Sequence, residues 1–336
     1  MALLGVLRRW ARRITAANAA PVAAPSAPLP LAPPAGGLAL ALQGGGAFGA
    51  FTWGVLERLL EERAFQPLGL TGASAGAVNA VALATGWAAG GAEGARDRLA
   101  RIWTRVGTAG SGLLGLDLPG AGLARSVGST AFRLTSRLLS PYQLNPLNLN
   151  PLRTILEEEL DFTALRRADA PRVVISTTRV RDGRPRLFDN DDIDLDALLA
   201  STTLPMLHRA VEIGGEAYWD GGFTLNPPIR PLLPAGSPIL LVQALPVGSG
   251  ETPVTAPAIQ ARLSQIVFSR ALEDEYERAD ESLARLGRAG ALQRLAIDAH
   301  AAAALGADGL RADLEHLIAL KSLGRAQAES WLAVHG

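Results

Sequence analysis

Two neighbouring stretches decide the fold: LALALQGGGAFGAFTWGVLERLL at residues 38–60 and LGLTGASAGAVNAVALAT at residues 68–85. Each opens with a short apolar run typical of a buried strand, turns through glycine, and continues with apolar residues at helical spacing. Two strand-turn-helix units in succession imply parallel strands joined by right-handed crossovers. The sequence therefore predicts an α/β sheet with helices on both faces.

The second of these turns, GASAG at residues 72–76, carries a candidate nucleophile. Its two glycines permit a sharp bend that lifts the Ser74 hydroxyl out of the end of the sheet, and the following helix directs its positive end at the same place. The alternative is that Ser74 only caps an alanine-rich helix. The strand-turn-helix context favours the nucleophile, and we expect Ser74 to attack a carbonyl.

The first turn, Gly44 to Gly46, is a candidate anion cradle, because a glycine run turns several backbone N–H groups inward. Such a loop holds either a phosphate or the oxyanion of an acyl-transfer reaction. No lysine follows it, as a phosphate-binding loop requires, and no acidic residue stands about twenty positions on to bind a ribose. An oxyanion loop beside Ser74 is the better interpretation.

A third signal is DGG at residues 220–222, directly after hairpin-like text with a Gly214-Gly215 turn. Asp220 then stands near the end of a strand, where a carboxylate faces a cleft. Taken alone, DGG is more typical of a solvated Asp-Gly turn.

The attacking hydroxyl must lose its proton, so a base must lie within reach of Ser74. None of the four histidines has a context comparable to that of Asp220. Only His300, two residues after Asp298, offers a Ser-Asp-His order, and it stays open as an alternative.

The composition excludes several classes of function. Lys+Arg and Asp+Glu both number 32, so the chain has no net charge that would gather nucleic acid, and none is expected as a partner. With no cysteine and four scattered histidines, no metal site is expected. No apolar run reaches the roughly 18 to 20 residues of a membrane span. We expect a cytoplasmic protein.

The chain divides into an arm and a main part. Residues 1–37 hold no acidic residue and end in an Ala/Pro/Gly linker. Within residues 1–17, apolar side chains fall on one side of a helix and four arginines on the other, which suits either peripheral contact with the inner face of a membrane or docking on protein. The apolar segment 107–150 is interpreted as a lid or as a helical insertion, and residues 258–336 as several helices.

Four blocks in this order resemble the patatin-like phospholipases: QGGGAFG at 43–49, GASAGAVN at 72–79, ASTTLP at 200–205 and DGG at 220–222. The resemblance spans about residues 38–245. It implies a three-layer α/β/α sandwich with a mainly parallel central sheet, a catalytic dyad of Ser74 and Asp220, and no cofactor or metal. It also implies an oxyanion hole made of the amides of Gly44, Gly45 and Gly46.

Two more residues are predicted to contact substrate. Phe48 stands where many relatives carry arginine or another polar residue, and we expect it to narrow the site toward apolar acyl esters; Ala75 follows the nucleophile. The predicted function of the domain at 38–336 is that of a serine acyl hydrolase acting on lipid or fatty-acyl esters. A non-catalytic lipid-binding or regulatory protein, and an acyltransferase using the same dyad, are the alternatives.

Overall fold

The computed structural model of the chain describes residues 37–113, 140–145, 148–246, 252–305, 309 and 311–335. The arm at 1–17 and most of the segment 107–150 lie outside the described residues, so their predicted roles stay predictions. Within the described ranges, no helix combines the length and the apolar character needed to cross a membrane.

A mixed sheet forms the centre of the fold. Its strands are β1 (Leu38–Leu42), β2 (Pro67–Gly72), β3 (Arg172–Arg179), β4 (Pro185–Asp189), β5 (Val211–Ile213), β6 (Glu216–Asp220), β7 (Ile239–Gln243) and β8 (Leu292–Ala296). Their order is β5-β6-β3-β2-β1-β7-β8, with β4 also paired to β3. The run β3-β2-β1-β7-β8 is parallel, whereas β4, β5 and β6 join by antiparallel pairing. The prediction of a mainly parallel sheet is confirmed.

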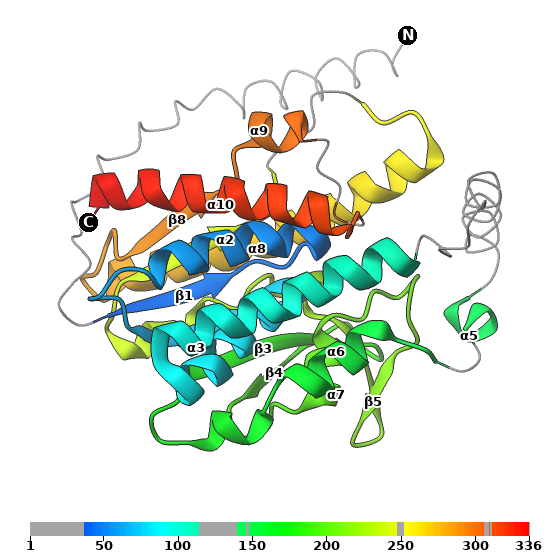
Figure 1. Ribbon diagram of the computed structural model, residues 1–336, viewed down its shortest axis with the longest axis horizontal. Helices are drawn as coiled ribbons and strands as arrows, with labels where there is room; N and C mark the ends of the chain where they lie inside the picture. The colour runs from blue at the N-terminus through cyan, green and yellow to red at the C-terminus, as the bar shows by residue number, and fades with distance from the viewer. Residues whose placement is uncertain are drawn as a thin grey trace, which may run out of the picture. The chain divides into compact units, whose positions relative to one another are not determined.

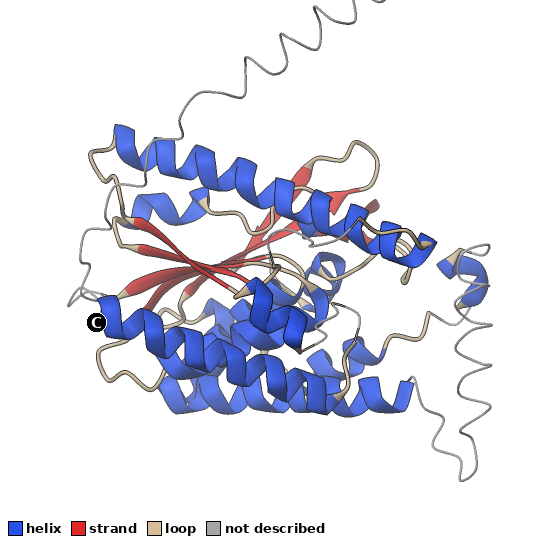
Figure 2. Ribbon diagram, turned by 90° about the horizontal axis from the view of Figure 1, so that it is seen from above, coloured by secondary structure: helices blue, strands red, loops and turns tan. Residues whose placement is uncertain are grey.

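Helices lie on both sides of this sheet (Figure 2). They are α2 (Gly49–Leu59), α3 (Ala75–Leu113), α5 (Pro141–Leu144), α6 (Pro151–Glu159), α7 (Leu195–Ser201), α8 (Ala256–Arg285), α9 (Ala299–Ala304) and α10 (Leu314–His335), with short 3₁₀ turns at Gly46–Phe48, Phe162–Arg166, Gly221–Phe223 and Arg230–Ala235. Figure 1 shows α2, α3 and α10 running across one face. The three-layer α/β/α architecture is confirmed.

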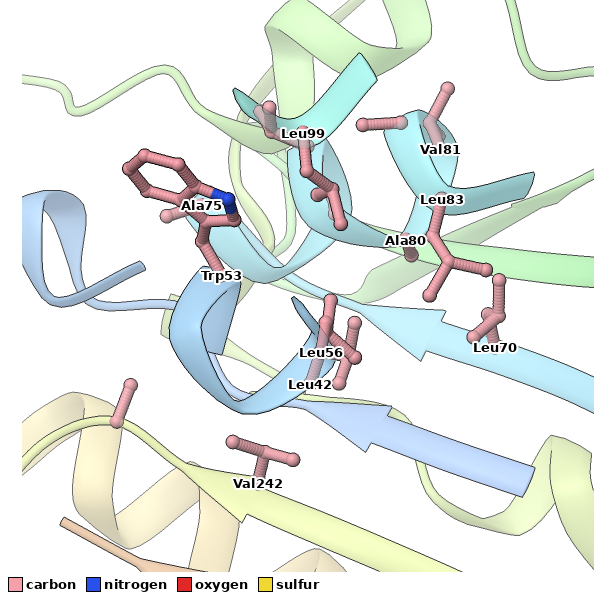
Figure 3. Packing of buried hydrophobic residues seen from close by; sticks show 14 of the residues in the cluster. Leu42, Trp53, Leu56, Leu70, Ala75, Ala80, Val81, Leu83, Leu99 and Val242 are labelled. Atoms are coloured by element: carbon pink, nitrogen blue, oxygen red, sulfur yellow. The ribbon is translucent and has the colours of Figure 1, made fainter. Parts of the chain in front are cut away.

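Strand β1 shows why the sheet is covered twice. Its even-numbered leucines, Leu38, Leu40 and Leu42, belong to the large core with α2 and α3, while Ala39 and Ala41 belong to a second core with α8. Alternate side chains of a strand point to opposite faces, so a strand that is apolar at every position needs a layer on each side. Figure 3 shows Leu42, Leu56 and Leu70 among the side chains of the larger core.

The C-terminal helix α10 packs closely on α2. A Cβ atom added at Gly54 or Gly324 would collide with the backbone of the facing helix, so glycine is required at both positions. Charged pairs flank this contact: Arg325 Nη1 lies 2.8 Å from Glu57 Oε2, and Lys321 Nζ lies 2.8 Å from Glu57 Oε1. These contacts attach the end of the chain to the helix that follows the glycine loop.

The structure differs from the predicted elements in three places. The helix expected at residues 75–85 continues to Leu113, with a break at Gly90 and Gly91 where the backbone leaves helical geometry. The edge strand β4 was not predicted. The C-terminal region contains strand β8 as well as helices, because Leu292 to Ala296 pairs in parallel with β7. In so short a strand the alternation of apolar and polar side chains is a weak signal, and the partner strand β7 lies about fifty residues earlier in the sequence.

Candidate active site

Ser74 occupies a strained turn between β2 and α3. Its φ of 52° lies in the left-handed region, which is unusual for a residue with a side chain and costs about 1–2 kcal/mol. The residue is 6% exposed, and its N–H donates to the backbone oxygen and to the hydroxyl of Ser201, each at 3.1 Å. The strain is therefore held in place by an element 127 residues further along the chain.

The two glycines of the turn are required by close packing. A side chain at Gly72 would strike the backbone of Gly76 across the bend, and one at Gly76 would strike the end of β1 at Leu42. Since Leu42 pairs with Gly72 in the sheet, the turns after β1 and β2 leave from the same level. The glycine loop and Ser74 are thus neighbours at the carboxyl edge of the sheet.

The glycine loop offers fewer free donors than the sequence implied. The N–H of Gly44 donates to the side-chain oxygen of Asn226 at 2.8 Å, so it is already engaged. A Cβ at Gly44 would lie 2.6 Å from that of Ser74, which shows how closely the loop approaches the turn. Within the part of the chain that the structure describes, the N–H groups of Gly45, Gly46 and Ala75 donate no hydrogen bond. These three amides are available to a ligand.

Asp220 reaches the same edge because β3 is longer than its parallel neighbour. Residues 172–175 of β3 pair with β2, and the projecting half pairs with β6 in the opposite direction. Asp220, the last residue of β6, stands opposite Thr177, beyond the end of β2 at Gly72. Antiparallel pairing on a projecting strand thus carries a distant carboxyl group to the turn that holds Ser74.

The carboxyl group of Asp220 is completely buried. Burial raises its pKa to about 7, while interaction with the Ser74 side chain and the N–H of Gly222 acts in the opposite direction. Oδ1 accepts a hydrogen bond from Gly222 N at 2.7 Å. Oδ2 has no hydrogen-bond partner among the described residues, and the Ser74 side chain is close enough to the carboxyl group to lower its pKa. A free, buried carboxylate oxygen beside a hydroxyl is suited to accept a proton.

Residues 40–233 match the model of a known protein family, Patatin-like phospholipase. The chain belongs to the patatin-like phospholipase family. This membership assigns it broadly to the lipid acyl hydrolases. The matched region contains the last three residues of β1, all of β2 to β6 and both glycine turns, and it ends before β7, α8, β8 and α10.

The chain was also compared with curated proteins and with solved structures. No curated protein matches the sequence. Among solved structures, the crystal structure of VipD from Legionella pneumophila is similar to this chain at 14% identity and a TM-score of 0.46, over 89% of this chain and 67% of that one.

The end of α7 joins the two halves of this patatin-like site. Ser201 accepts the N–H of Ser74, and two residues later the backbone oxygen of Thr203 accepts the N–H of Asp220 at 2.9 Å. Both residues are buried and belong to the ASTTLP block at 200–205. The block was part of the resemblance, but its role as a bridge between the serine and the aspartate emerges only from the fold.

Asn226 is the residue that sequence reasoning missed. It is fully buried, and its side chain accepts from Gly44 N and donates to Gly44 O and Phe268 O, each at 3.4 Å. It links the glycine loop after β1 to helix α8. The only local signal is an asparagine before two prolines, six residues after Asp220.

The remaining predicted residues lie as follows. Phe48 is 2% exposed and packs in the larger core, and Ala75 begins α3 at 8% exposure. His300 lies in α9, whose N-terminus Asp298 caps. Among the described residues, no hydrogen bond joins a histidine to Ser74 or Asp220, and no three His, Asp or Glu side chains form a group that could hold a metal ion.

Proposed function

We propose that this chain is a serine acyl hydrolase that cleaves lipid acyl esters, with Ser74 as nucleophile and Asp220 as base. One observation carries the proposal: a fully buried carboxyl group with a pKa raised to about 7 stands beside a serine held in a strained turn. A base whose pKa lies near neutral pH accepts a proton from the attacking hydroxyl and returns it to the leaving group with little penalty.

In the first half of the proposed cycle, Ser74 Oγ attacks the ester carbonyl as its proton passes to Oδ2 of Asp220. The tetrahedral intermediate then loses its alcohol: the carbon–oxygen bond breaks, and the leaving oxygen takes the proton from Asp220. An acyl-enzyme on Ser74 remains. Because Oδ1 is already engaged by Gly222, the other oxygen is the one free to exchange the proton.

The oxyanion requires donors that are not already in use. Gly44 has none to spare, so we assign this role to the N–H groups of Gly45 and Gly46, with that of Ala75 at the start of α3. A preorganised backbone donor of this kind lowers the barrier by roughly 3 kcal/mol. The positive end of the first helical part of α3 favours the same charge.

In the second half, a water molecule attacks the acyl carbon and gives its proton to Asp220. Collapse of this intermediate breaks the bond to Ser74, whose oxygen recovers the proton, and a fatty acid leaves. Family membership supports a lipid as substrate. Contact of residues 1–17 with a membrane surface stays a prediction.

The test compares Ser74→Ala with Ser237→Ala, since both serines are 6% exposed and the hydroxyl of Ser237 has no hydrogen-bond partner among the described residues. We expect Ser74→Ala to lose fluorophosphonate labelling and ester hydrolysis, and Ser237→Ala to retain both. Persistent labelling of Ser74→Ala would mean that another serine reacts. A wild-type chain that binds lipid but cleaves no ester or phospholipid would be a lipid-binding protein, and new esters formed with an added alcohol would indicate acyl transfer.

A further inference from the structure

Helix α8 exposes an apolar stripe that its packing does not explain. Ile259, Leu263, Ile266 and Val267 follow one another at helical spacing, and each is between 41% and 53% exposed. The core side of the same helix carries Phe268, Leu272, Glu275, Ala279 and Leu283, all buried. At about 100° per residue, the two sets point in opposite directions. The exposed stripe is therefore not an extension of the core-facing side.

The charged side chains nearest the stripe are arginines: between residues 252 and 272 they are Arg262 and Arg270. Arg270 pairs with Asp274 on the next turn of α8, with 2.6 Å between Nη2 and Oδ1. Arg262 is thus the basic side chain that flanks the stripe. An aliphatic stripe flanked by a basic side chain suits a helix that lies in the headgroup region of a lipid surface.

The helix that carries the stripe also reaches the candidate active site. Directly after Val267, on the opposite side of α8 from the stripe, the ring of Phe268 packs edge-on against Phe223, with ring centroids 5.1 Å apart. A Cβ added at Gly222, two residues from Asp220, would lie 2.8 Å from the same ring. Figure 1 shows the first turns of α8, in yellow, extending away from the strands. The inner side of α8 therefore contacts the turn after Asp220, while the stripe lies on the outer side of the same helix.

Two further exposed apolar residues follow the segment that holds the N–H of Asp220. Met206 and Leu207, 59% and 43% exposed, follow shortly after Thr203, whose backbone oxygen holds the N–H of Asp220. Exposed apolar residues thus lie on two of the elements that contact the Asp220 turn. Apolar side chains gathered around a functional site mark a binding surface more often than scattered exposed residues do.

We propose that the first half of α8, through the stripe of Ile259, Leu263, Ile266 and Val267, inserts into the surface of lipid aggregates and brings the site to its substrate. The inference rests on the proposed function, because the occupant is the aggregate from which the acyl ester is drawn. Burial of the aliphatic side chains supplies the binding energy, and Arg262 favours an anionic surface.

The test uses the full chain carrying Leu263→Asp and Ile266→Asp, beside a control, Leu286→Asp. Leu286 is an apolar residue, 63% exposed, at the C-terminal end of the same helix. Fatty acid release is measured on vesicles of phosphatidylcholine with some phosphatidylglycerol, and on a short-chain p-nitrophenyl ester in free solution. For the double variant we expect roughly 100-fold slower vesicle cleavage, about tenfold for each side chain withheld from the lipid. Hydrolysis of the dissolved ester should stay within about twofold of wild type, and the control should match wild type in both assays.

A second readout does not require catalysis. Because the chain has no cysteine, Leu263→Cys accepts a single environment-sensitive fluorophore, and Leu286→Cys provides the matched control. Vesicles should shift the emission of the label at 263 to the blue and leave that at 286 unchanged. All variants keep residues 1–17, so any vesicle binding by the arm is common to them.

The outcomes separate the two proposals. A wild-type chain inactive on the dissolved ester, with the blue shift present, would remove the hydrolase and retain lipid docking. Full vesicle cleavage by the double variant, or an unshifted label at 263, would overturn the docking. Equal loss in both assays would show that the stripe supports the catalytic geometry instead. A wild-type dimer that the double variant converts to a monomer would show that a second copy covers the stripe.

Discussion

Replacing Asp220 by asparagine should make the folded chain more stable at high pH while it slows catalysis. The carboxyl has its ordinary pKa of 3.8 when unfolded and about 7 in the fold. At about 1.4 kcal/mol per pKa unit, this difference corresponds to roughly 4 kcal/mol. The folded state binds the proton more tightly, so stability is greatest below the unfolded pKa and is lost as pH rises through the folded one.

The structure indicates why asparagine is the informative substitution. Its side-chain oxygen still accepts from Gly222 N, and its NH₂ group takes the place of Oδ2 beside Ser74 without a charge. It therefore mimics the protonated carboxyl. The stability is lost between the unfolded pKa of 3.8 and the folded pKa of about 7, and about two units of that interval lie above pH 5. Between pH 5 and pH 9, wild type should therefore lose roughly 3 kcal/mol relative to the variant.

Urea unfolding of both proteins at about pH 5 and pH 9 measures this difference. In parallel, kcat/KM of wild type on a soluble ester should rise with pH to half its maximum near pH 7, because Asp220 must lose its proton to act as a base. The variant should be slower by at least about 100-fold at any pH. If the two proteins lose stability in parallel between pH 5 and pH 9, the buried carboxyl does not hold its proton, and the argument for Asp220 as a tuned base is refuted.

Three other predictions concern the scaffold and the rival base. Asn226→Ala leaves the N–H of Gly44 buried without a partner, so we expect kcat on a soluble ester to fall by about tenfold or more with KM nearly unchanged, as shown by initial rates. Gly324→Ala forces a methyl group against the backbone of α2, and urea titration should show a loss of about 1–3 kcal/mol, with no loss for Gly90→Ala, where nothing lies within 4 Å. His300→Ala should leave kcat/KM within about twofold of wild type, and a large loss would revive the Ser-Asp-His alternative.

The parts of the site that sequence reasoning could predict are those built by local chain geometry. The strands at 38–42 and 67–72, their glycine turns and the Gly214-Gly215 hairpin each follow from residues within a few positions of one another. Glycine at 72 and 76 is enforced by contacts within the turn and with the adjacent strand. Local patterns of this kind are legible because the same residues that make the bend also appear side by side in the sequence.

The contacts that decide which groups are free are not local. Gly44 was predicted as an oxyanion donor, and nothing near it in the sequence shows that Asn226, 182 residues away, takes its N–H. The bridge from Ser201 and Thr203 to the serine and the aspartate is equally remote. Such hydrogen-bond partners depend on the register of the strands and on the course of the loops. Neither can be read from the residues next to them in the sequence.

The candidate site lowers the stability of the molecule that contains it. The left-handed Ser74 costs about 1–2 kcal/mol, and at high pH the buried Asp220 costs roughly 4 kcal/mol. Together these are comparable to the whole net stability of many domains, about 5–15 kcal/mol. Such a site persists only where its surroundings cannot relax. Here Ser201 at the end of α7 accepts the N–H of Ser74, and Thr203 accepts the N–H of Asp220. The N–H of Gly44 donates to Asn226, which also bonds to α8. Since α8 lies outside the family match, the asparagine that fixes the glycine loop is itself held partly by the C-terminal part of the chain.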